Sequence, residues 1–248
     1  DRTAARVVLV GESAGADVRA AGVRVDERGR AGYRLLTPTG EADVRLAVHG
    51  VHQVGNSLAA AAVALELGMP PAEIGTGLAE ARSLSRWRME VTERPDGVLV
   101  VNDAYNANPE SMAAALRALE TMARGRRGWA VLGAMGELGP TAPEEHAAIG
   151  RLARRLGVDR LVVVGPDAVG IHAPRPPADR SGPADPGDEG WAGKSTHVPD
   201  VDAAVALLRA ELRPGDVVLV KASRSVGLDR VASALLDPAV AAGTGGAR

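Results

Sequence analysis

The first fifty residues alternate short apolar runs with glycine-rich or charged turns. Four of these runs carry β-branched residues or alternating apolar positions, a pattern typical of strands with one buried face, and they span residues 6–10, 18–25, 33–37 and 44–48. The spacing of the apolar residues then changes. Residues 52–67 consist mostly of Ala, Leu and Val and predict a long, largely buried helix. Gly68 ends this helix, and Pro70-Pro71 begins a second helix that we expect to reach about Leu84.

From residue 85 onward, strand patterns and helix patterns alternate. Residues 89–93 and 98–102 predict a hairpin around Pro95-Asp96-Gly97. Asn108 is placed to cap a helix that begins at Pro109, and the segment from Thr141 to Glu144 has the spacing of a capping box. Further strands are predicted at 129–132, 161–164 and 217–220, and helices at 109–123, 141–156, 201–212 and 228–236.

The alternation and the apolar strands together predict the fold class. Strands that are wholly apolar and alternate with helices form parallel sheets covered on both faces. We therefore expect an α/β chain: strands plus Ala-rich helices first, and then a Rossmann-like, doubly wound and mostly parallel sheet domain.

Composition narrows the class of protein. With 248 residues and 46% hydrophobic content, the chain can bury one large core or two modest ones. The net charge of -2 predicts neither a nucleic-acid partner nor an anionic membrane surface, and no apolar run approaches the roughly 20 residues of a membrane helix. Cysteine is absent, which excludes disulfides and thiolate metal sites and fits a cytoplasmic location. The start at Asp1, without an initiator Met or signal-peptide core, we interpret as the start of a fragment.

Several segments have no apolar period or carry glycine clusters. Residues 173–193 predict a mobile surface insertion, and residues 238–248 a flexible tail. Gly193-Lys194-Ser195 is similar to the end of a phosphate-binding P-loop, but the motif requires Gly at the position of Asp188, and the segment falls in the predicted insertion. The glycines at 11–15 and 133–139 do not match a dinucleotide-binding motif, and tight turns explain them better.

The segment with the strongest chemical signal is 102–109, Asn-Asp-Ala-Tyr-Asn-Ala-Asn-Pro. A buried strand ends here in polar and aromatic residues and leads to a helix N-terminus, which is where open α/β sheets bind ligands. The carboxylate of Asp103 can accept hydrogen bonds from ribose hydroxyls, and Asn106 and Asn108 offer donors and acceptors. For Asn108 alone, a purely structural role as helix cap explains the sequence equally well.

This octet resembles the D-x-Y-N-A-N-P signature of the Mur ligase family, in the variant that adds D-alanyl-D-alanine to UDP-N-acetylmuramoyl-tripeptide during peptidoglycan precursor synthesis. Other segments resemble that family's motifs in the expected order. They are residues 49–56, similar to G-x-H-N-x-x-N; residues 86–90, similar to G-R-M-E; residues 133–139, similar to G-x-M-x-E-L-G, with His146 on the next helix; and residues 220–224, similar to V-K-G-S-R.

The resemblance implies a domain division and residue roles. Residues 1–84 would close the central ATP-binding domain, residues 85–237 would form the C-terminal ligase domain, and a hinge near Ser85 would join them. The implied nucleotide-binding residues are His52 and Asn56 at the adenine, Asp103 at the ribose, Arg88 at the ribose or phosphate, and Tyr105, Asn106 and Asn108 beside them. The implied catalytic residues, which face the dipeptide or an acyl-phosphate, are Lys221, Ser223 and Arg224.

The resemblance also implies ATP and Mg²⁺ as cofactors, a UDP-peptide and D-alanyl-D-alanine as substrates, and a cytoplasmic monomer. The P-loop lysine and Mg²⁺ ligands of the family would lie before residue 1, so we expect this chain alone not to catalyse ligation, and we assign no metal ligand to it. Two residues depart from the motifs: Gln53 stands in place of Asn, and Ala222 in place of Gly, which suits a position that does not require positive φ.

Other interpretations remain open. Tripeptide-forming ligases of the same superfamily and folylpolyglutamate synthase usually carry D-x-A-H-N-P, which the segment Tyr105-Asn106-Ala107-Asn108-Pro109 does not match. A non-catalytic binding module that keeps only the Rossmann-like domain is a different class of function. At the level of single residues, His52 could be an ordinary helix-start histidine and Arg224 a solvated charge.

Overall fold

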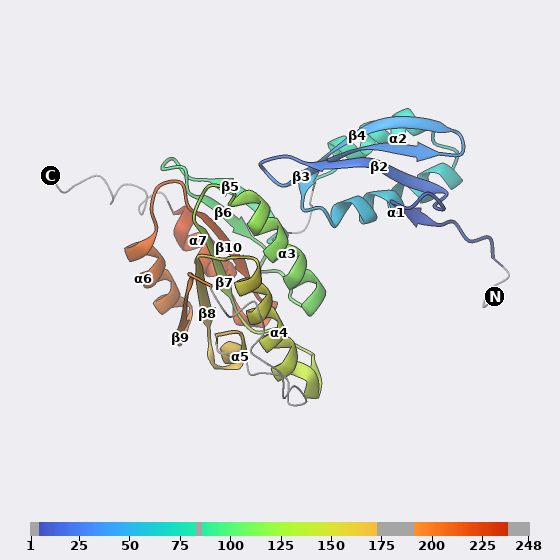
Figure 1. Cartoon of the computed structure of the whole chain (residues 1–248). Helices are drawn as coiled ribbons and strands as arrows, with labels where there is room; N and C mark the ends of the chain where they lie inside the picture. The colour runs from blue at the N-terminus through green and yellow to red at the C-terminus, as the bar shows by residue number, and fades with distance from the viewer. Residues whose placement is uncertain (1–4, 83–85, 173–190, 238–248) are drawn as a thin grey trace. The chain divides into compact units, whose positions relative to one another are not determined.

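The computed structural model describes residues 5–82, 86–172 and 191–237, and the chain divides into two compact units, residues 1–84 and 85–248 (Figure 1). The predicted hinge near Ser85, the tail at 238–248 and all but the last three residues of the predicted insertion lie outside the described residues. Among the described residues, no helix is both long enough and apolar enough to cross a membrane.

The first unit is a small sheet packed against two helices. Its strands lie in the order β1 (Val10–Gly11), β2 (Val18–Val25), β3 (Arg30–Thr37), β4 (Gly40–His49), with β2, β3 and β4 antiparallel and β1 parallel to β2. Helices α1 (Gln53–Glu66) and α2 (Pro71–Glu80) contribute Leu58 and Ile74 to the same apolar core as Leu35 of β3. The hydroxyls of Tyr33 and Ser57 lie 2.7 Å apart in this core, so both polar groups are satisfied where they are buried.

Two elements of the first unit are shorter than predicted. Residues 6–9 are not a strand, because the main chain of Leu9 bonds to the turn at Asp17, accepting from its N–H and donating to its carboxylate, instead of to a strand ladder. Helix α2 ends at Glu80, not near Leu84, because Ala81 has an extended ψ of 131° that breaks the helical hydrogen bonding.

The second unit contains a six-stranded sheet, and its strand order separates neighbours in sequence. The order is β5, β6, β10, β7, β8, β9, and every pair is parallel except β5 with β6, which form the predicted hairpin. The strands span Glu90–Glu93 (β5), Leu99–Asn102 (β6), Gly128–Leu132 (β7), Arg160–Val164 (β8), Lys194–Val198 (β9) and Val217–Lys221 (β10).

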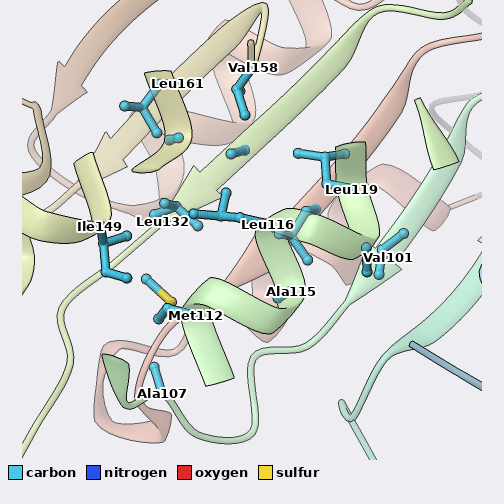
Figure 2. Close-up of a cluster of buried hydrophobic side chains, with 14 of the residues drawn as sticks. Val101, Ala107, Met112, Ala115, Leu116, Leu119, Leu132, Ile149, Val158 and Leu161 are labelled. Carbon is cyan, nitrogen blue, oxygen red and sulfur yellow. The ribbon is translucent and has the colours of Figure 1, made fainter. Parts of the chain in front are cut away.

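Helices cover both faces of this sheet, as the sequence predicts for apolar parallel strands (Figure 1). One face packs against α3 (Pro109–Met122), α4 (Ala142–Arg155) and α5 (Val169–His172), and the other against α6 (Val201–Glu211) and α7 (Asp229–Leu236). Figure 2 shows Met112 and Leu116 of α3 beside Leu132 of β7 and Ile149 of α4, all buried in the first of these cores. The chain is therefore an α/β protein with a doubly wound second unit.

The position of β10 creates a topological switch point at the carboxyl ends of the strands. β10 lies between β6 and β7, but the helices that follow β6 and β7 cover one face, whereas α7, which follows β10, covers the other. Connections that leave adjacent parallel strands toward opposite faces open a gap between their loops, and ligands bind at this switch point in doubly wound sheets. The loops at this switch point are those that follow Asn102, Leu132 and Lys221.

Two local predictions in the second unit are wrong. Lys194 and Ser195 do not belong to an irregular insertion: they begin β9, which pairs with β8 at the sheet edge. Thr141 does not form a capping box, because it ends a 3₁₀ turn (Gly139–Thr141) and its hydroxyl donates to the carbonyl of Leu138 at 2.9 Å. Helix α4 therefore continues from that turn without a side-chain cap.

At the amino ends of the strands, Asp216 connects β10 to β7. Its buried carboxylate accepts from Arg127 at 2.6 and 3.1 Å, from the indole N–H of Trp129 at 3.0 Å, and from the main-chain N–H of Arg213 at 2.9 Å. The hydrogen bond to Asp216 raises the pKa of the Arg127 guanidinium. This carboxylate is therefore the most heavily bonded side chain at that end of the sheet within the described residues.

We expect Gly150→Ala to destabilise the second unit by about 1–3 kcal/mol. A Cβ at this position of α4 would lie 2.2 Å from the carbonyl oxygen of Ile171, so α4 and α5 would have to separate. The matched change Gly77→Ala, in α2, meets no atom within 4 Å and should instead stabilise its helix by about 0.5–1 kcal/mol. Urea denaturation of the two variants measures both effects, and effects of the same sign would contradict the packing argument.

Candidate functional site

Four segments meet around the carboxyl end of β10 in the second unit. The loop at 103–108 follows β6, the loop at 133–139 follows β7, the segment 222–226 follows β10, and residues 86–89 lead into β5. Main-chain bonds fix their starting points, since the N–H of Asp103 donates to Val220 and the N–H of Gly133 donates to Lys221. The parallel register of β6, β10 and β7 thus brings together segments that are distant in sequence.

Lys221 and Asp103 form the centre of this arrangement. The ammonium of Lys221 donates to Oδ2 of Asp103 at 2.6 Å and to the main-chain carbonyl of Asn106 at 2.9 Å. The side chain of Lys221 is only 3% exposed and that of Asp103 is 13% exposed. A charge this well buried is stable only when paired, so each group holds the other in place. The structure directs the Lys221 ammonium toward the 103–106 loop.

Residues 86–89 dock onto the same loop through the main chain. Met89 donates its N–H to the second oxygen of Asp103 at 3.0 Å, and Tyr105 donates its N–H to the carbonyl of Trp87 at 3.0 Å. Trp87, Met89 and Glu137 have positive φ values of 61°, 48° and 61°, and within the described chain no other non-glycine residue does. Such a backbone conformation costs on the order of 1–3 kcal/mol per residue, and residues that adopt it cluster at functional sites.

Two arginines and two aromatic rings form a surface cluster beside this pair. The guanidinium of Arg88 lies 4.3 Å from the ring centre of Tyr105, and the guanidinium of Arg224 lies 5.6 Å from the same ring and 5.7 Å from the ring of Trp87. Both arginines are exposed, and neither guanidinium forms an ion pair or hydrogen bond with another described residue. This cluster is therefore able to attract an anionic ligand such as phosphate or carboxylate.

Ser223 joins the 133–139 loop to the 103–108 loop. Its hydroxyl accepts from the N–H of Gly136 at 2.7 Å and donates to the carbonyl of Ala107 at 3.3 Å, while its own N–H donates to the carbonyl of Ala134. Ser223 is buried, whereas its neighbour Arg224 is exposed. The segment thus has a fixed, buried serine next to a solvent-facing cation.

The two departures from the family motifs, one in each unit, have simple structural accounts. Ala222 does not have positive φ, as predicted, and its methyl group packs on Gly133, where an added Cβ would lie 2.8 Å away. In the first unit, Gln53 accepts a hydrogen bond from the amide of Asn56 at 2.9 Å.

Asn106 and Asn108 use their side chains within the loop. The side-chain oxygen of Asn106 accepts from the N–H of Ala107 at 2.9 Å. Asn108 caps α3, as predicted, accepting from the N–H of Ser111 at 2.8 Å while the Ser111 hydroxyl accepts from the N–H of Asn108 at 3.1 Å. The structural role as helix cap therefore accounts for the side-chain oxygen of Asn108.

We expect Asn108→Ala to cost about 1 kcal/mol of stability because α3 loses this cap. Asn108→Asp keeps the accepting oxygen at the helix N-terminus and should be nearly as stable as the natural chain. Urea denaturation of the two variants tests the cap. Equal losses in both would show that the amide nitrogen, and not the capping oxygen, carries the effect.

His52 and Asn56 lie in the first unit, at the start of α1. Both are exposed, and the ring of His52 packs so closely on Gly50 that an added Cβ would lie 2.4 Å from it. At the end of β4, burial lowers the pKa of His49, and the neighbouring guanidinium of Arg30 lowers it further. The structure thus brings together the candidates of the second unit, whereas His52 and Asn56 are exposed residues of the first unit.

The site contains contacts that sequence reasoning missed. The sequence does not indicate that Trp87 contacts Arg224 or that Met89 donates to Asp103, and for His146 it gives only the position on the helix. The aromatic residue between two arginines at 86–88 was the one available signal. No group of three or more His, Cys, Asp or Glu that could hold a metal ion lies within the described ranges.

Comparisons with known proteins identify similar sequences and similar structures for this chain. The family described as Mur ligase, glutamate ligase domain, matches residues 87–224. The UDP-N-acetylmuramoyl-tripeptide–D-alanyl-D-alanine ligase of Mycobacterium tuberculosis is 52% identical over 242 residues, which cover 94% of this chain and 47% of that protein. The enzyme of the same name from Escherichia coli is 31% identical over 225 residues, or 90% of this chain and 45% of that protein.

Solved structures of MurF ligases are also similar to this chain. MurF from Acinetobacter baumannii superposes with a TM-score of 0.75 at 29% identity, over 92% of this chain and 46% of that one. MurF ligase from Thermotoga maritima, in complex with ADP, superposes with a TM-score of 0.69 at 26% identity, over 92% of this chain and 47% of that one. The chain spans about half the length of the relatives it matches.

Proposed function

This chain belongs to the Mur ligase family, and from that premise we propose that it forms part of an ATP-dependent ligase that joins D-alanyl-D-alanine to UDP-N-acetylmuramoyl-tripeptide. The observation that carries the proposal is 52% identity, over 94% of the chain, to a ligase of that name. The Tyr105-Asn106 pair in the loop after β6 supports the same branch of the family, because it differs from the Ala-His pair expected of tripeptide-forming ligases.

In this proposal, residues 1–84 contribute to the ATP-binding domain and residues 85–237 form the C-terminal ligase domain. The residues of the second unit fit a nucleotide by their chemistry. The carboxylate of Asp103 can accept from ribose hydroxyls, and the exposed guanidinium of Arg88, free of carboxylate partners in the described chain, can bind a phosphate. We also assign Tyr105, Asn106 and Asn108 to nucleotide binding. From the first unit, we assign His52 and Asn56 to the adenine.

Arg224 is the residue that we assign to the reacting groups. ATP supplies the phosphoryl group that activates the peptide carboxylate, and negative charge then accumulates on the oxygens around the attacked carbon. The exposed guanidinium of Arg224 can stabilise that charge or bind the dipeptide carboxylate. Ser223 fixes the main chain beside it.

We assign Lys221 a role different from the one that the family resemblance implies. Its ammonium is occupied by Asp103 and Asn106 and is almost fully buried, so we assign it to holding the nucleotide-side loop and not to contact with the dipeptide. We propose that the Mg²⁺ ligands lie mostly in the remainder of the ligase, as the family resemblance implies. We also propose a cytoplasmic location, where ATP and UDP-linked precursors are available, and a monomeric enzyme.

The test uses the complete ligase that carries this chain. We expect ADP release only when UDP-N-acetylmuramoyl-tripeptide and D-alanyl-D-alanine are both present. ADP release with a single amino acid in place of the dipeptide would assign the chain to another branch of the family. Nucleotide binding without any ADP release would favour the non-catalytic binding module.

A further inference from the structure

His146 makes two hydrogen bonds that define its chemical state. It lies on α4 and is 3% exposed. Its Nε2 accepts from the main-chain N–H of Met135 at 2.9 Å, and its Nδ1 lies 2.7 Å from the main-chain carbonyl of Ala142. An amide N–H can only donate and a carbonyl can only accept, so Nε2 must carry the lone pair and Nδ1 the proton. The ring is therefore neutral, in the Nδ1–H tautomer.

The bond to Met135 fixes the loop that holds Ser223. Met135 stands between Ala134, whose carbonyl accepts from the N–H of Ser223, and Gly136, whose N–H donates to the Ser223 hydroxyl. Both neighbours of Met135 thus bond to one residue, and the orientation of the peptide units between them depends on where the Met135 N–H points. His146 supplies the acceptor that sets this direction.

We propose that His146 is a positioning residue for the reaction: it holds the 133–139 loop, which in turn orients Ser223 and the adjacent Arg224. This role rests on the proposed ligase function, because Arg224 acts on the reacting groups there. His146 itself touches neither Ser223 nor Arg224 by any hydrogen bond in the described chain, so its effect passes through Met135 and Gly136.

Two substitutions with amide side chains distinguish the two hydrogen bonds of the His146 imidazole. Glutamine places its oxygen near the position of Nε2 and can still accept from Met135, whereas asparagine reaches only as far as Nδ1 and loses that bond. His146→Gln and His146→Asn are thus a matched pair: both remove the ring, but only glutamine keeps the contact that the proposal requires.

The first measurement is amide hydrogen exchange in the 248-residue chain. In His146→Asn, exchange at Met135 and Gly136 should accelerate about tenfold, as expected for the loss of one buried hydrogen bond. In His146→Gln, it should stay within about twofold of the natural chain. Unchanged exchange at Met135 in His146→Asn, or equal acceleration in both variants, would overturn the proposal.

A measurement on the unsubstituted chain does not depend on whether the variants fold. The imidazole ¹⁵N chemical shifts of His146 should show a protonated Nδ1 and an unprotonated Nε2. The opposite tautomer, or a doubly protonated ring at neutral pH, is incompatible with acceptance from Met135 and would overturn the proposal.

The second measurement is kinetic and uses the complete ligase. His146→Asn should lower kcat/KM for D-alanyl-D-alanine about tenfold with little change in the KM for ATP, and His146→Gln should recover most of the loss. A parallel rise in the KM for ATP, or no recovery with glutamine, would reduce His146 to a general structural residue. If the unsubstituted ligase does not use these substrates, the proposed function fails, while the exchange data still decide whether His146 holds the loop.

Discussion

Replacement of Asp216 by alanine should lower the free energy of unfolding of the second unit by about 3–5 kcal/mol, the cost of breaking a buried ion pair from one side. The substitution leaves Arg127 without its carboxylate and removes the acceptor from the indole N–H of Trp129. It also releases the N–H of Arg213 just before β10. Urea denaturation followed by circular dichroism measures the loss.

Asp167→Ala is the matched control for that experiment. Asp167 is exposed, and its side chain forms no hydrogen bond or ion pair with the part of the chain that the structure describes. Its removal should leave the denaturation midpoint nearly unchanged. A comparable loss in both variants would mean that Asp216 contributes through general charge and not through its specific bonds.

Replacement of Lys221 by methionine should destabilise the second unit by a similar amount, about 3–5 kcal/mol. Methionine fills the space of the lysine stem but leaves the Asp103 carboxylate, at 13% exposure, with the N–H of Met89 as its remaining partner. The carbonyl of Asn106 loses its donor as well. Lys194→Met is the natural control, because Lys194 is exposed on β9 and the chain has no other lysine.

A double-mutant cycle separates the ion pair from other effects of the substitution. Asp103→Asn alone leaves the Lys221 ammonium buried without a carboxylate, so it should also be costly. The double variant Asp103→Asn, Lys221→Met removes both charges and should be more stable than the sum of the single losses predicts, by about 1–3 kcal/mol. Simple additivity would show that the two charges do not stabilise each other.

Local patterns in the sequence predict most of the elements, because short-range physics determines them. Apolar runs with helical spacing identify α3 and α4, and Asn108 followed by Pro109 identifies a capped helix start. The sequence patterns predict neither β9 nor the short helix α5, and for β9 the physical reason is clear. Its sequence, Lys-Ser-Thr-His-Val, is polar because it lies at the sheet edge, so no apolar run indicates it.

The contacts of the site depend on the order of the strands in the sheet, which the spacing of apolar residues along the sequence does not predict. Lys221 and Asp103 are 118 residues apart, and nothing in the sequence places β10 between β6 and β7. The family resemblance identified both residues but implied that Lys221 faces the dipeptide, whereas the structure shows its ammonium bonded to Asp103 and Asn106. The partner of His146 is a main-chain N–H, which no sequence motif specifies.

The late position of β10 in the sequence has a consequence for how the second unit folds. During synthesis, β6 and β7 are made early, yet each lacks its central neighbour until residues 217–221 have left the ribosome. The mean sequence separation of these pairings is large, which slows folding. Lys221 is the last residue of the same strand, so the strand that completes the centre of the sheet also carries the partner of Asp103. A nascent chain shorter than this has neither a complete core nor the ion pair that holds the 103–108 loop.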